Sequence, residues 1–320
     1  MRYLITGGAG FIGGHLSELL CRENHSVVAI DNLSTGSLEN IKALMNCPNF
    51  TFIQDDIMTC QNLDELVAAA DVVVHLAASV GVELVVHSPM QTIQNNIHGS
   101  ERVLLAAAKH HVRVVLASTS EVYGKSTKEF FNEADDLLIG ASTHSRWSYA
   151  CSKLLDEFYL MALYRQQKLP GTVVRFFNTV GPRQTGQYRM VIPRFVGAAL
   201  KNEPICVFGD GLQSRCFCHV QDTIRAVYDL TKNQESIGQI YNIGSQESIT
   251  ILELAKFVKA RLNSQSEIVM IPYAEAYEAG FEDMRRRKPD TAKVRSLLNW
   301  HPLNPLEKII DDVAACLRRN

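Results

Sequence analysis

A glycine-rich turn after the first apolar run of the chain is the feature that most constrains the fold. The segment reads Thr6-Gly7-Gly8-Ala9-Gly10-Phe11-Ile12-Gly13 and follows an apolar run at residues 3–5. A strand-to-helix turn needs glycine where the backbone bends tightly, where it approaches a phosphate and where the helix packs on the strand. Backbone N–H groups at the start of such a helix face the phosphate charge. The segment therefore predicts a βαβ unit that can hold a dinucleotide.

An acidic residue after the second apolar run supports this interpretation. Residues 26–30 form that run, and Asp31 follows it about 20 residues after the glycine-rich turn. An acid at this place accepts hydrogen bonds from the adenosine ribose hydroxyls and repels the extra phosphate of NADP. The next residue, Asn32, is neutral. Together the two residues favour NAD as the dinucleotide.

Apolar runs alternate with helical periodicity through the first half of the chain, which predicts parallel strands with helices on both faces. After residue 177, turns rich in glycine and proline interrupt this rhythm. The fold class we expect is α/β, with a doubly wound parallel sheet of Rossmann type over residues 1–177 and a smaller C-terminal α/β substrate-binding domain mainly over 178–320. We expect strands at 3–6, 26–30, 51–54, 72–76, 112–117 and 172–175, a returning strand at 239–243, and helices at 13–23, 62–70, 94–110, 148–167 and 248–262.

Composition and charge exclude several classes of protein. The 320 residues include 32 Lys and Arg against 34 Asp and Glu, which gives a net charge of −2. No run of like charge predicts binding to nucleic acid or to an anionic membrane, and no apolar stretch approaches the roughly 20 residues that a membrane span needs. The chain opens without a secretory signal pattern. Its 8 cysteines form no Cys-x-x-Cys pair, so we expect reduced thiols, no metal site and a cytoplasmic protein.

Two polar segments carry candidate catalytic groups. Tyr149 and Lys153 are four residues apart, hence on one face of an expected helix. A phenol, whose ordinary pKa is about 10, is a poor base at neutral pH unless a cation stabilises its phenolate. Lys153 and a positive nicotinamide ring would supply that charge. Thr119 and Glu121 follow a buried strand, at the edge where open α/β sheets bind ligands.

Over essentially its whole length, the chain resembles the extended short-chain dehydrogenase/reductase family of nucleotide-sugar enzymes. The features that carry the resemblance occur in the same order as in that family: the glycine-rich turn, Asp31, Thr119 and the Tyr149–Lys153 pair. The resemblance implies an NAD-dependent enzyme that oxidises C4 of a UDP-sugar. Thr119 and Tyr149 would hold the 4-hydroxyl, Tyr149 would take its proton, and Lys153 would also hold the nicotinamide ribose. The cofactor-binding residues that it implies are Gly7, Gly10, Phe11, Ile12, Gly13, Asp31, Asn32, Asp56, Ile57, Leu76, Ala77, Ala78, Asn96, Tyr149, Lys153 and Phe176.

The same resemblance implies a substrate side and a partner. Two guanidinium groups match a nucleotide diphosphate better than ammonium groups would. The implied substrate-binding residues are Ser79, Thr119, Asn178, Val207, Arg215 and Arg287, with core packing as the alternative role of Val207. Relatives pair two helices, here 94–110 and 148–167, against those of a second copy, so we expect a homodimer.

The reaction that follows C4 oxidation depends on Glu121. Thr119-Ser120-Glu121 is similar to the triplet of UDP-glucuronate decarboxylases and GDP-mannose 4,6-dehydratases. The decarboxylases are also resembled by three other segments, Ser145-Arg146-Trp147-Ser148-Tyr149, Gly181-Pro182-Arg183 and Arg287-Lys288-Pro289. Ser79-Val80-Gly81-Val82-Glu83-Leu84 departs from their proline-rich, tyrosine-bearing loop. We therefore expect UDP-glucuronate decarboxylation, with 4-epimerisation of a UDP-hexose or UDP-uronate as the alternative. A 4,6-dehydratase and a non-catalytic NAD-sensing scaffold are less favoured.

Overall fold

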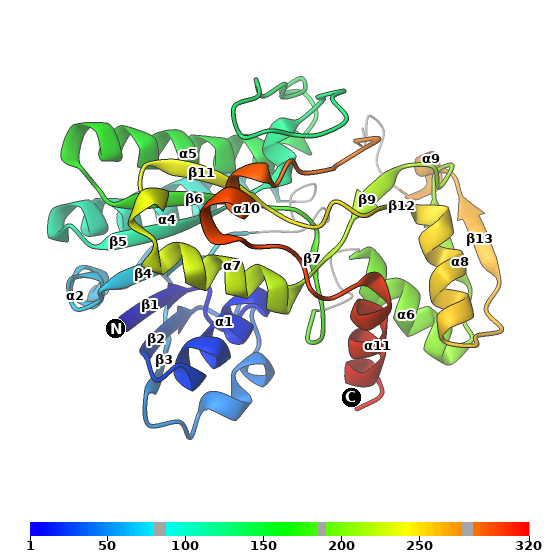
Figure 1. Ribbon diagram of the computed structural model, residues 1–320, viewed down its shortest axis with the longest axis horizontal. Helices are drawn as coiled ribbons and strands as arrows, with labels where there is room; N and C mark the ends of the chain where they lie inside the picture. Colours follow the sequence, from blue (N-terminus) through cyan, green and yellow to red (C-terminus); the bar gives the residue numbers. More distant parts are fainter. Residues whose placement is uncertain (80–87, 185–189, 277–283, 320) are drawn as a thin grey trace.

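A sheet of seven parallel strands forms the centre of the computed structural model, which describes residues 1–79, 88–184, 190–276 and 284–319. The strand order is β11-β6-β5-β4-β1-β2-β3 (Figure 1). The order reverses between β1 and β4, which opens a crevice beyond their carboxyl ends. The predicted doubly wound sheet is confirmed. Its strands are β1 (Arg2–Thr6), β2 (Ser26–Asp31), β3 (Phe50–Gln54), β4 (Val72–His75), β5 (Arg113–Thr119), β6 (Gly171–Phe176) and β11 (Gln239–Ile243).

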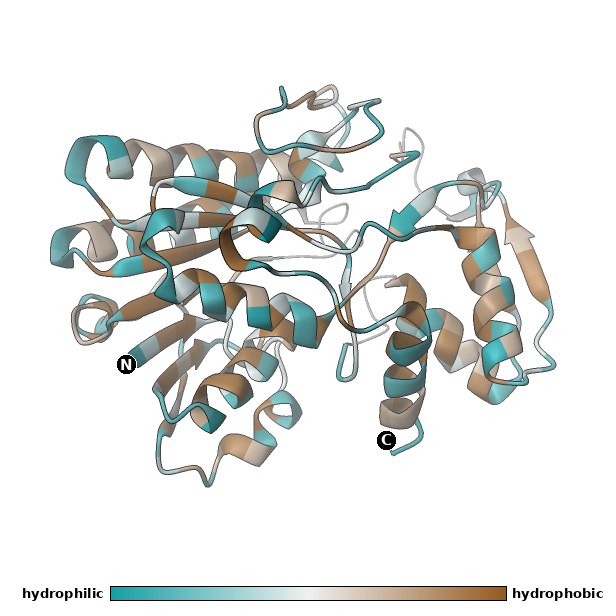
Figure 2. Ribbon diagram, viewed as in Figure 1, coloured by the Kyte–Doolittle hydropathy of each residue, from teal (hydrophilic) through white to brown (hydrophobic). Residues whose placement is uncertain are grey.

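Helices cover both faces of this sheet. Successive strand residues point to opposite faces, so Tyr3 and Ile5 enter one hydrophobic core while Leu4 enters the other. Figure 2 shows the central strands largely in hydrophobic colours and the helices with a hydrophilic side. One face carries α1 (Phe11–Arg22), α7 (Val220–Lys232) and α10 (Ala292–Leu298), and the other carries α2 (Leu63–Ala68), α4 (Pro89–His110) and α5 (Trp147–Gln167).

The chain after β6 builds a smaller unit and also returns to the large sheet. Three helices, α6 (Val191–Lys201), α8 (Ile251–Arg261) and α11 (Leu306–Leu317), share a core with β8 (Ile205–Phe208), which pairs with β13 (Ile268–Ile271). The segments α7, β11 and α10 pack instead on the first sheet. The remaining elements are β7 (Thr179–Val180), β9 (Ser214–Cys216), β10 (Cys218–His219), β12 (Ser248–Thr250), α9 (Tyr273–Ala276) and the 3-10 turns η1 (Leu38–Asn40), η2 (Lys42–Leu44), η3 (Ser120–Tyr123) and η5 (Gln234–Ser236).

Two predicted helix starts are wrong. The helix expected at 94–110 begins at Pro89, where proline suits the first helical position because it lacks an N–H. The helix expected at 248–262 begins at Ile251, because the three residues before it form β12, antiparallel to β9. Thr250 and Glu253 form a capping box at its start.

Polar contacts fix the smaller unit to the large sheet. Asp222 on α7 accepts hydrogen bonds from the N–H of Leu303 and from the N–H of Asn304, both at 3.0 Å, in the segment between α10 and α11. Arg183, after β7, donates both terminal nitrogens to the Glu18 carboxylate of α1, at 2.6 and 2.8 Å. These contacts set the position of α11 and of the β7 segment against the sheet. Among the described residues, no helix has the length and apolar character that crossing a bilayer requires.

Candidate functional site

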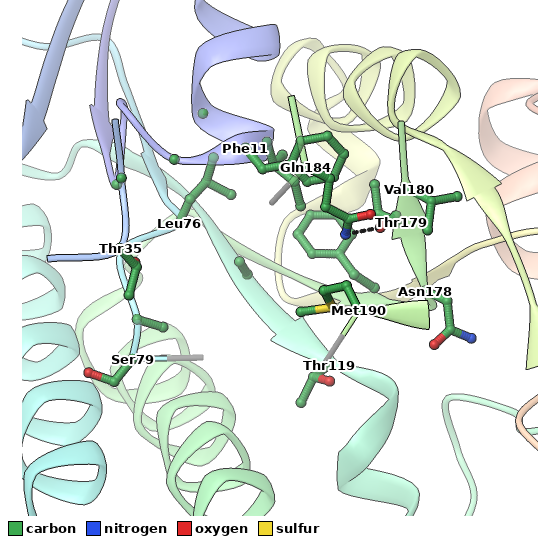
Figure 3. A pocket seen from close by; sticks show the side chains of 18 of the residues that line it. Phe11, Thr35, Leu76, Ser79, Thr119, Asn178, Thr179, Val180, Gln184 and Met190 are labelled. Carbon is green, nitrogen blue, oxygen red and sulfur yellow. Dashed lines mark hydrogen bonds between the residues drawn. The ribbon is translucent and has the colours of Figure 1, made fainter. Parts of the chain in front are cut away.

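A cavity of about 1100 Å³ lies along the carboxyl ends of the parallel strands and reaches the smaller unit. Residues at or just after the ends of β1, β2, β4, β5 and β6 line it, together with residues of α6, β8 and α11. In the close-up of Figure 3, Thr35 and Ser79 lie on one side and Asn178 and Val180 on the other. The cavity therefore occupies the crevice that the reversal of strand order creates.

The glycine-rich turn forms one end of this cavity, and the backbone around Gly7 and Gly13 leaves no room for a side chain. Gly7 has φ +69°, and a Cβ there would lie 2.8 Å from the backbone nitrogen of Ala77. A Cβ at Gly13 would lie 2.2 Å from the Gly7 carbonyl oxygen. The following helix, α1, has Gly10 as its N-cap, without a side-chain cap. Its first N–H groups therefore remain available to an anion in the cavity.

Asp31 lies beside this turn at the end of β2. Its carboxylate accepts the N–H of Ala9 at 3.0 Å and the N–H of Leu33 at 2.8 Å. Burial raises the pKa of Asp31, and these backbone hydrogen bonds oppose the rise. The neighbouring Asn32 donates to Asp56 at 2.9 Å. The predicted adenosine-binding residues are thus brought together at the same end of the cavity.

Tyr149, Lys153 and Thr119 meet in the middle of the cavity. Burial raises the pKa of Tyr149 above its ordinary value, the carboxylates of Glu121 and Asp156 raise it further, and a hydrogen bond with Thr119 acts in the opposite direction. Lys153 is almost fully buried, and its Nζ lies 2.8 Å from Asp156 Oδ2. The phenol is therefore a weaker acid than free tyrosine. Its use as a base requires further positive charge beside it.

Glu121 is held between two arginines on the substrate side. Arg146 donates to its Oε2 at 3.1 Å, and Arg287 contacts its Oε1. Burial alone would raise the pKa of Glu121, but Arg287, Arg146 and Arg215 outweigh it and lower that pKa to about 2. Glu121 is therefore ionised at neutral pH. Among the described residues, three guanidinium groups thus act on this one carboxylate, and guanidinium groups suit an anionic ligand.

Two predicted site residues do not line the cavity. Asn96 is buried behind its wall, where it accepts the N–H of Ser79 at 2.7 Å and donates to Ser152 Oγ at 3.0 Å. Val207 enters the core of the smaller unit, since strand alternation turns Phe208 to the cavity instead. The other predicted residues line the cavity: Gly7, Gly10, Phe11, Ile12, Gly13, Asp31, Asn32, Asp56, Ile57, Leu76, Ala77, Ala78, Ser79, Thr119, Glu121, Tyr149, Lys153, Phe176, Asn178, Arg215 and Arg287. The unusual loop at Val80 to Leu84 lies outside the described residues.

Sequence reasoning left three cavity residues without a role. Arg146 stands three positions before Tyr149, and this spacing on a helix start could have placed it on the same side. Arg194 on α6 lies 4.0 Å from the ring centre of Phe208, and no sequence pattern marks it. The side-chain oxygen of Gln213 is buried with no hydrogen-bond partner among the described residues, so it can accept a hydrogen bond from a ligand.

Comparison with known proteins establishes the family. Residues 3–244 match the NAD dependent epimerase/dehydratase family. The chain is 42% identical over 302 residues to UDP-N-acetyl-alpha-D-glucosaminuronate decarboxylase of Bacillus cytotoxicus, covering 94% of this chain and 92% of that protein. It is 33% identical over 312 residues to UDP-glucuronic acid decarboxylase 1 of Danio rerio, covering 96% and 70%.

Solved structures agree with the sequence relatives. The fold is similar to that of UDP-glucose 4-epimerase from Thermotoga maritima with UDP-glucose, with a TM-score of 0.89 and 29% identity over 100% of this chain and 99% of that one. It is also similar to UDP-glucuronic acid 4-epimerase from Bacillus cereus with UDP-glucuronic acid and NAD, with a TM-score of 0.90, 27% identity and the same coverage of 100% and 99%. The chain belongs to the NAD dependent epimerase/dehydratase family, is an enzyme of that family, and has NAD as its cofactor. The resemblance found in its sequence is confirmed.

Replacing Gly13 by alanine is expected to raise the Kd for NAD at least tenfold, equivalent to about 1.4 kcal/mol. The new Cβ would lie 2.2 Å from the Gly7 oxygen, so the turn must move away from the phosphates. Isothermal titration with NAD measures this change. Gly197→Ala is the matched control, since its Cβ on α6 would meet only Leu317 Cδ1 at 4.0 Å. Equal Kd values for Gly13→Ala and the wild type would contradict the assignment of the turn.

Proposed function

We propose that this enzyme decarboxylates a UDP-linked uronate after transient oxidation of the sugar at C4. The observation that carries the proposal is the cluster of Glu121 with Arg146, Arg215 and Arg287, in the same cavity as Tyr149. Its guanidinium groups suit a ligand that bears a sugar carboxylate in addition to a diphosphate. The two decarboxylases to which the chain is 42% and 33% identical support the same reaction. Candidate substrates are UDP-glucuronate and UDP-N-acetylglucosaminuronate.

In this proposal the two parts of the chain divide the binding of cofactor and substrate. Residues 1–177 with β11 hold NAD, with the glycine-rich turn at the pyrophosphate and Asp31 at the adenosine ribose. Most of residues 178–320 hold the UDP-sugar, with Arg215 and Arg287 on its anionic groups. When bound, NAD would accept the hydride that leaves C4 of the sugar and would bring the positively charged nicotinamide ring close to Tyr149. That ring, with Lys153, offsets the burial and the carboxylates that raise the Tyr149 pKa.

Oxidation at C4 makes loss of the carboxylate chemically accessible. Thr119 orients the 4-hydroxyl, and Tyr149 accepts its proton as the hydride leaves C4. The resulting ketone is β to the carboxylate carbon, so the electrons of the bond from C5 to that carbon move toward the C4 oxygen as carbon dioxide leaves. C5 then takes a proton from solvent water, the hydride returns to C4, and Tyr149 gives its proton back to the 4-oxygen. Glu121 cannot donate the proton at C5, because the lowered pKa of about 2 keeps it ionised.

Product analysis tests the reaction directly. Purified protein is incubated with NAD and, in separate reactions, with UDP-glucuronate, UDP-N-acetylglucosaminuronate, UDP-glucose and UDP-N-acetylglucosamine. Mass spectrometry and proton NMR are expected to show loss of carbon dioxide from a uronate and no change in the neutral sugars. A C4 epimer of equal mass, formed from any of the four without decarboxylation, would overturn the proposal in favour of 4-epimerisation.

Replacing Glu121 by glutamine is expected to keep C4 oxidation and to lower decarboxylated product about tenfold or more, equivalent to at least about 1.4 kcal/mol of barrier. Without the Glu121 charge that pairs with them, Arg146 and Arg287 bind and stabilise more strongly the substrate carboxylate that must leave. The measurements are NADH absorbance and carbon dioxide release. Glu65→Gln on α2, outside the cavity, is the control. Unchanged carbon dioxide release by Glu121→Gln would remove Glu121 from the mechanism.

We also propose that the protein is a homodimer that pairs through α4 and α5. These neighbouring helices expose large apolar side chains, with exposed fractions of 38% for Ile93 and 45% for Leu105 on α4 and of 46% for Leu155 and 66% for Phe158 on α5. Large exposed apolar side chains on two neighbouring helices are typical of a protein interface. A second copy of the same surface is its occupant, in line with the frequency of two-fold symmetry among soluble oligomers.

Phe158→Asp is expected to convert the dimer to monomers, since each interface would bury two new carboxylates without partners. Sedimentation equilibrium measures the mass, which should fall from two chains to one. Leu303→Asp is the control, because Leu303 is similarly exposed at 60% but lies between α10 and α11. A monomeric wild type, or a Phe158→Asp protein that stays dimeric, would contradict the pairing.

The cysteines support a reducing compartment, and we propose the cytoplasm. All eight are free, as expected where thiols are kept reduced. Burial raises the pKa of Cys216 to about 11 and that of Cys218 to about 12. These two thiols therefore stay protonated and unreactive at neutral pH.

A further inference from the structure

A chain of hydrogen bonds runs from Lys153 into the core, away from the cavity. Asp156 Oδ2 accepts from Lys153 Nζ and from Ser100 Oγ, each at 2.8 Å. Ser100 Oγ lies 3.0 Å from His75 Nε2, and His75 Nδ1 lies 2.6 Å from Thr6 Oγ1. The chain thus connects α5 through α4 to the ends of β4 and β1.

Only one arrangement of protons satisfies this chain. Ser100 has one hydroxyl proton and gives it to the Asp156 carboxylate, so His75 must donate to Ser100 from Nε2. Burial, with a further effect of Lys153, lowers the pKa of His75 to about 3, so the ring is neutral. Its Nδ1 then accepts from Thr6, whose oxygen accepts the N–H of Ala77 at 3.3 Å. Every donor in the chain has one acceptor.

The burial and charges around Asp156 give it a defined role. Both Asp156 and Lys153 are 2% exposed, and Asp156 does not line the cavity. Near Asp156, His75 on β4 is neutral and Glu157 on α5 is paired with Arg175 of β6 at 2.7 Å. Lys153 is therefore its ionic partner. A lysine side chain has four flexible bonds, so its ammonium group is held in place only by such an anchor.

We propose that Asp156 is a positioning residue that holds the Lys153 ammonium within reach of Tyr149 and the cofactor. Ser100 and His75 in turn fix Asp156 to the ends of β1 and β4. The inference rests on the proposed role of Tyr149 and Lys153 in C4 oxidation. It adds a residue that contacts neither substrate nor cofactor but determines where the charge of Lys153 lies.

The Asp156 charge also acts on Tyr149. The charged groups that face this phenol are Glu121 on η3, which is paired with Arg146 and Arg287, and Lys153 and Asp156 on α5. The carboxylates of Glu121 and Asp156 raise the pKa of Tyr149. Since the base form of Tyr149 exists above its pKa, activity rises with pH through the acidic limb of the pH profile. Asp156→Asn removes a carboxylate that raises this pKa and also releases the Lys153 ammonium that lowers it, so the position of the limb reports the balance of the two effects.

The test is Asp156→Asn, measured as NADH formation in a single turnover of UDP-glucuronate or UDP-N-acetylglucosaminuronate across a pH series. We expect the maximal rate to fall by up to about a hundredfold, the loss that a misplacement of about 1 Å can cause. The acidic limb should move from its wild-type position, and the Kd for the UDP-sugar should stay unchanged. Asp156→Glu, which keeps the charge, should restore the limb and part of the rate. Wild-type rate and limb in Asp156→Asn would overturn the proposal.

Two further variants separate positioning from general damage to the fold. Asp222→Asn makes the same change at another buried aspartate, 1% exposed and outside the cavity, and should lower stability without moving the limb. Ser100→Ala keeps the ion pair but cuts its link to His75, and should lower the rate less, with the limb in place. A shift of the limb in Asp222→Asn as large as in Asp156→Asn would contradict a specific role.

A readout that needs no substrate separates this proposal from the proposed function. In protein labelled with ¹⁵N-lysine, the Lys153 ammonium should give a signal protected from exchange in the wild type and not in Asp156→Asn. If the wild type forms no NADH from any UDP-sugar, the proposed function fails, and the lysine signal still decides whether Asp156 holds Lys153. An unchanged signal in Asp156→Asn would overturn the positioning.

Discussion

The pairing of β1 with β4 is the interaction on which the site depends. Its register places Thr6 opposite His75, so the residues that follow these two strands leave the sheet side by side. Gly7 can then approach Ala77 so closely that no Cβ fits between them. The same register brings Thr6 and His75 within hydrogen-bond distance, 2.6 Å. One strand pair thus sets the cofactor turn, the cavity wall and the polar chain that ends at Lys153.

Electrostatics divides the cavity into two parts with different chemistry. Around Tyr149, burial and nearby carboxylates oppose loss of the phenol proton, so oxidation at C4 requires the charges of Lys153 and the bound cofactor. Around Glu121, guanidinium groups keep a carboxylate ionised. Placing these parts side by side allows one sugar ring to be oxidised at C4 while its carboxylate lies among arginines. This arrangement fits decarboxylation better than hydride transfer alone.

The smaller unit contributes to the site because buried contacts hold it against the sheet. Asp222 holds the segment before α11, and Arg183 holds the segment after β7 against α1. Arg215 and Arg287 lie in the chain between Arg183 and Leu303, and both reach the same cavity as the glycine-rich turn. Substrate binding and cofactor binding are therefore set by one rigid packing, although their residues are far apart in the chain.

The sequence by itself determined what local physics controls. Periodicity predicted the strands and helices of the sheet, and glycine spacing, Asp31 and the four-residue step from Tyr149 to Lys153 predicted the dinucleotide turn and the catalytic pair. Only the tertiary structure decided which distant groups meet. Glu121 pairs with Arg287 across 166 positions, Asp156 meets Ser100 across 56, and Val207 turns from the cavity into a core. Local patterns fix backbone conformation and side-chain spacing, whereas such contacts depend on how strands pair and layers pack, which no short window of sequence encodes.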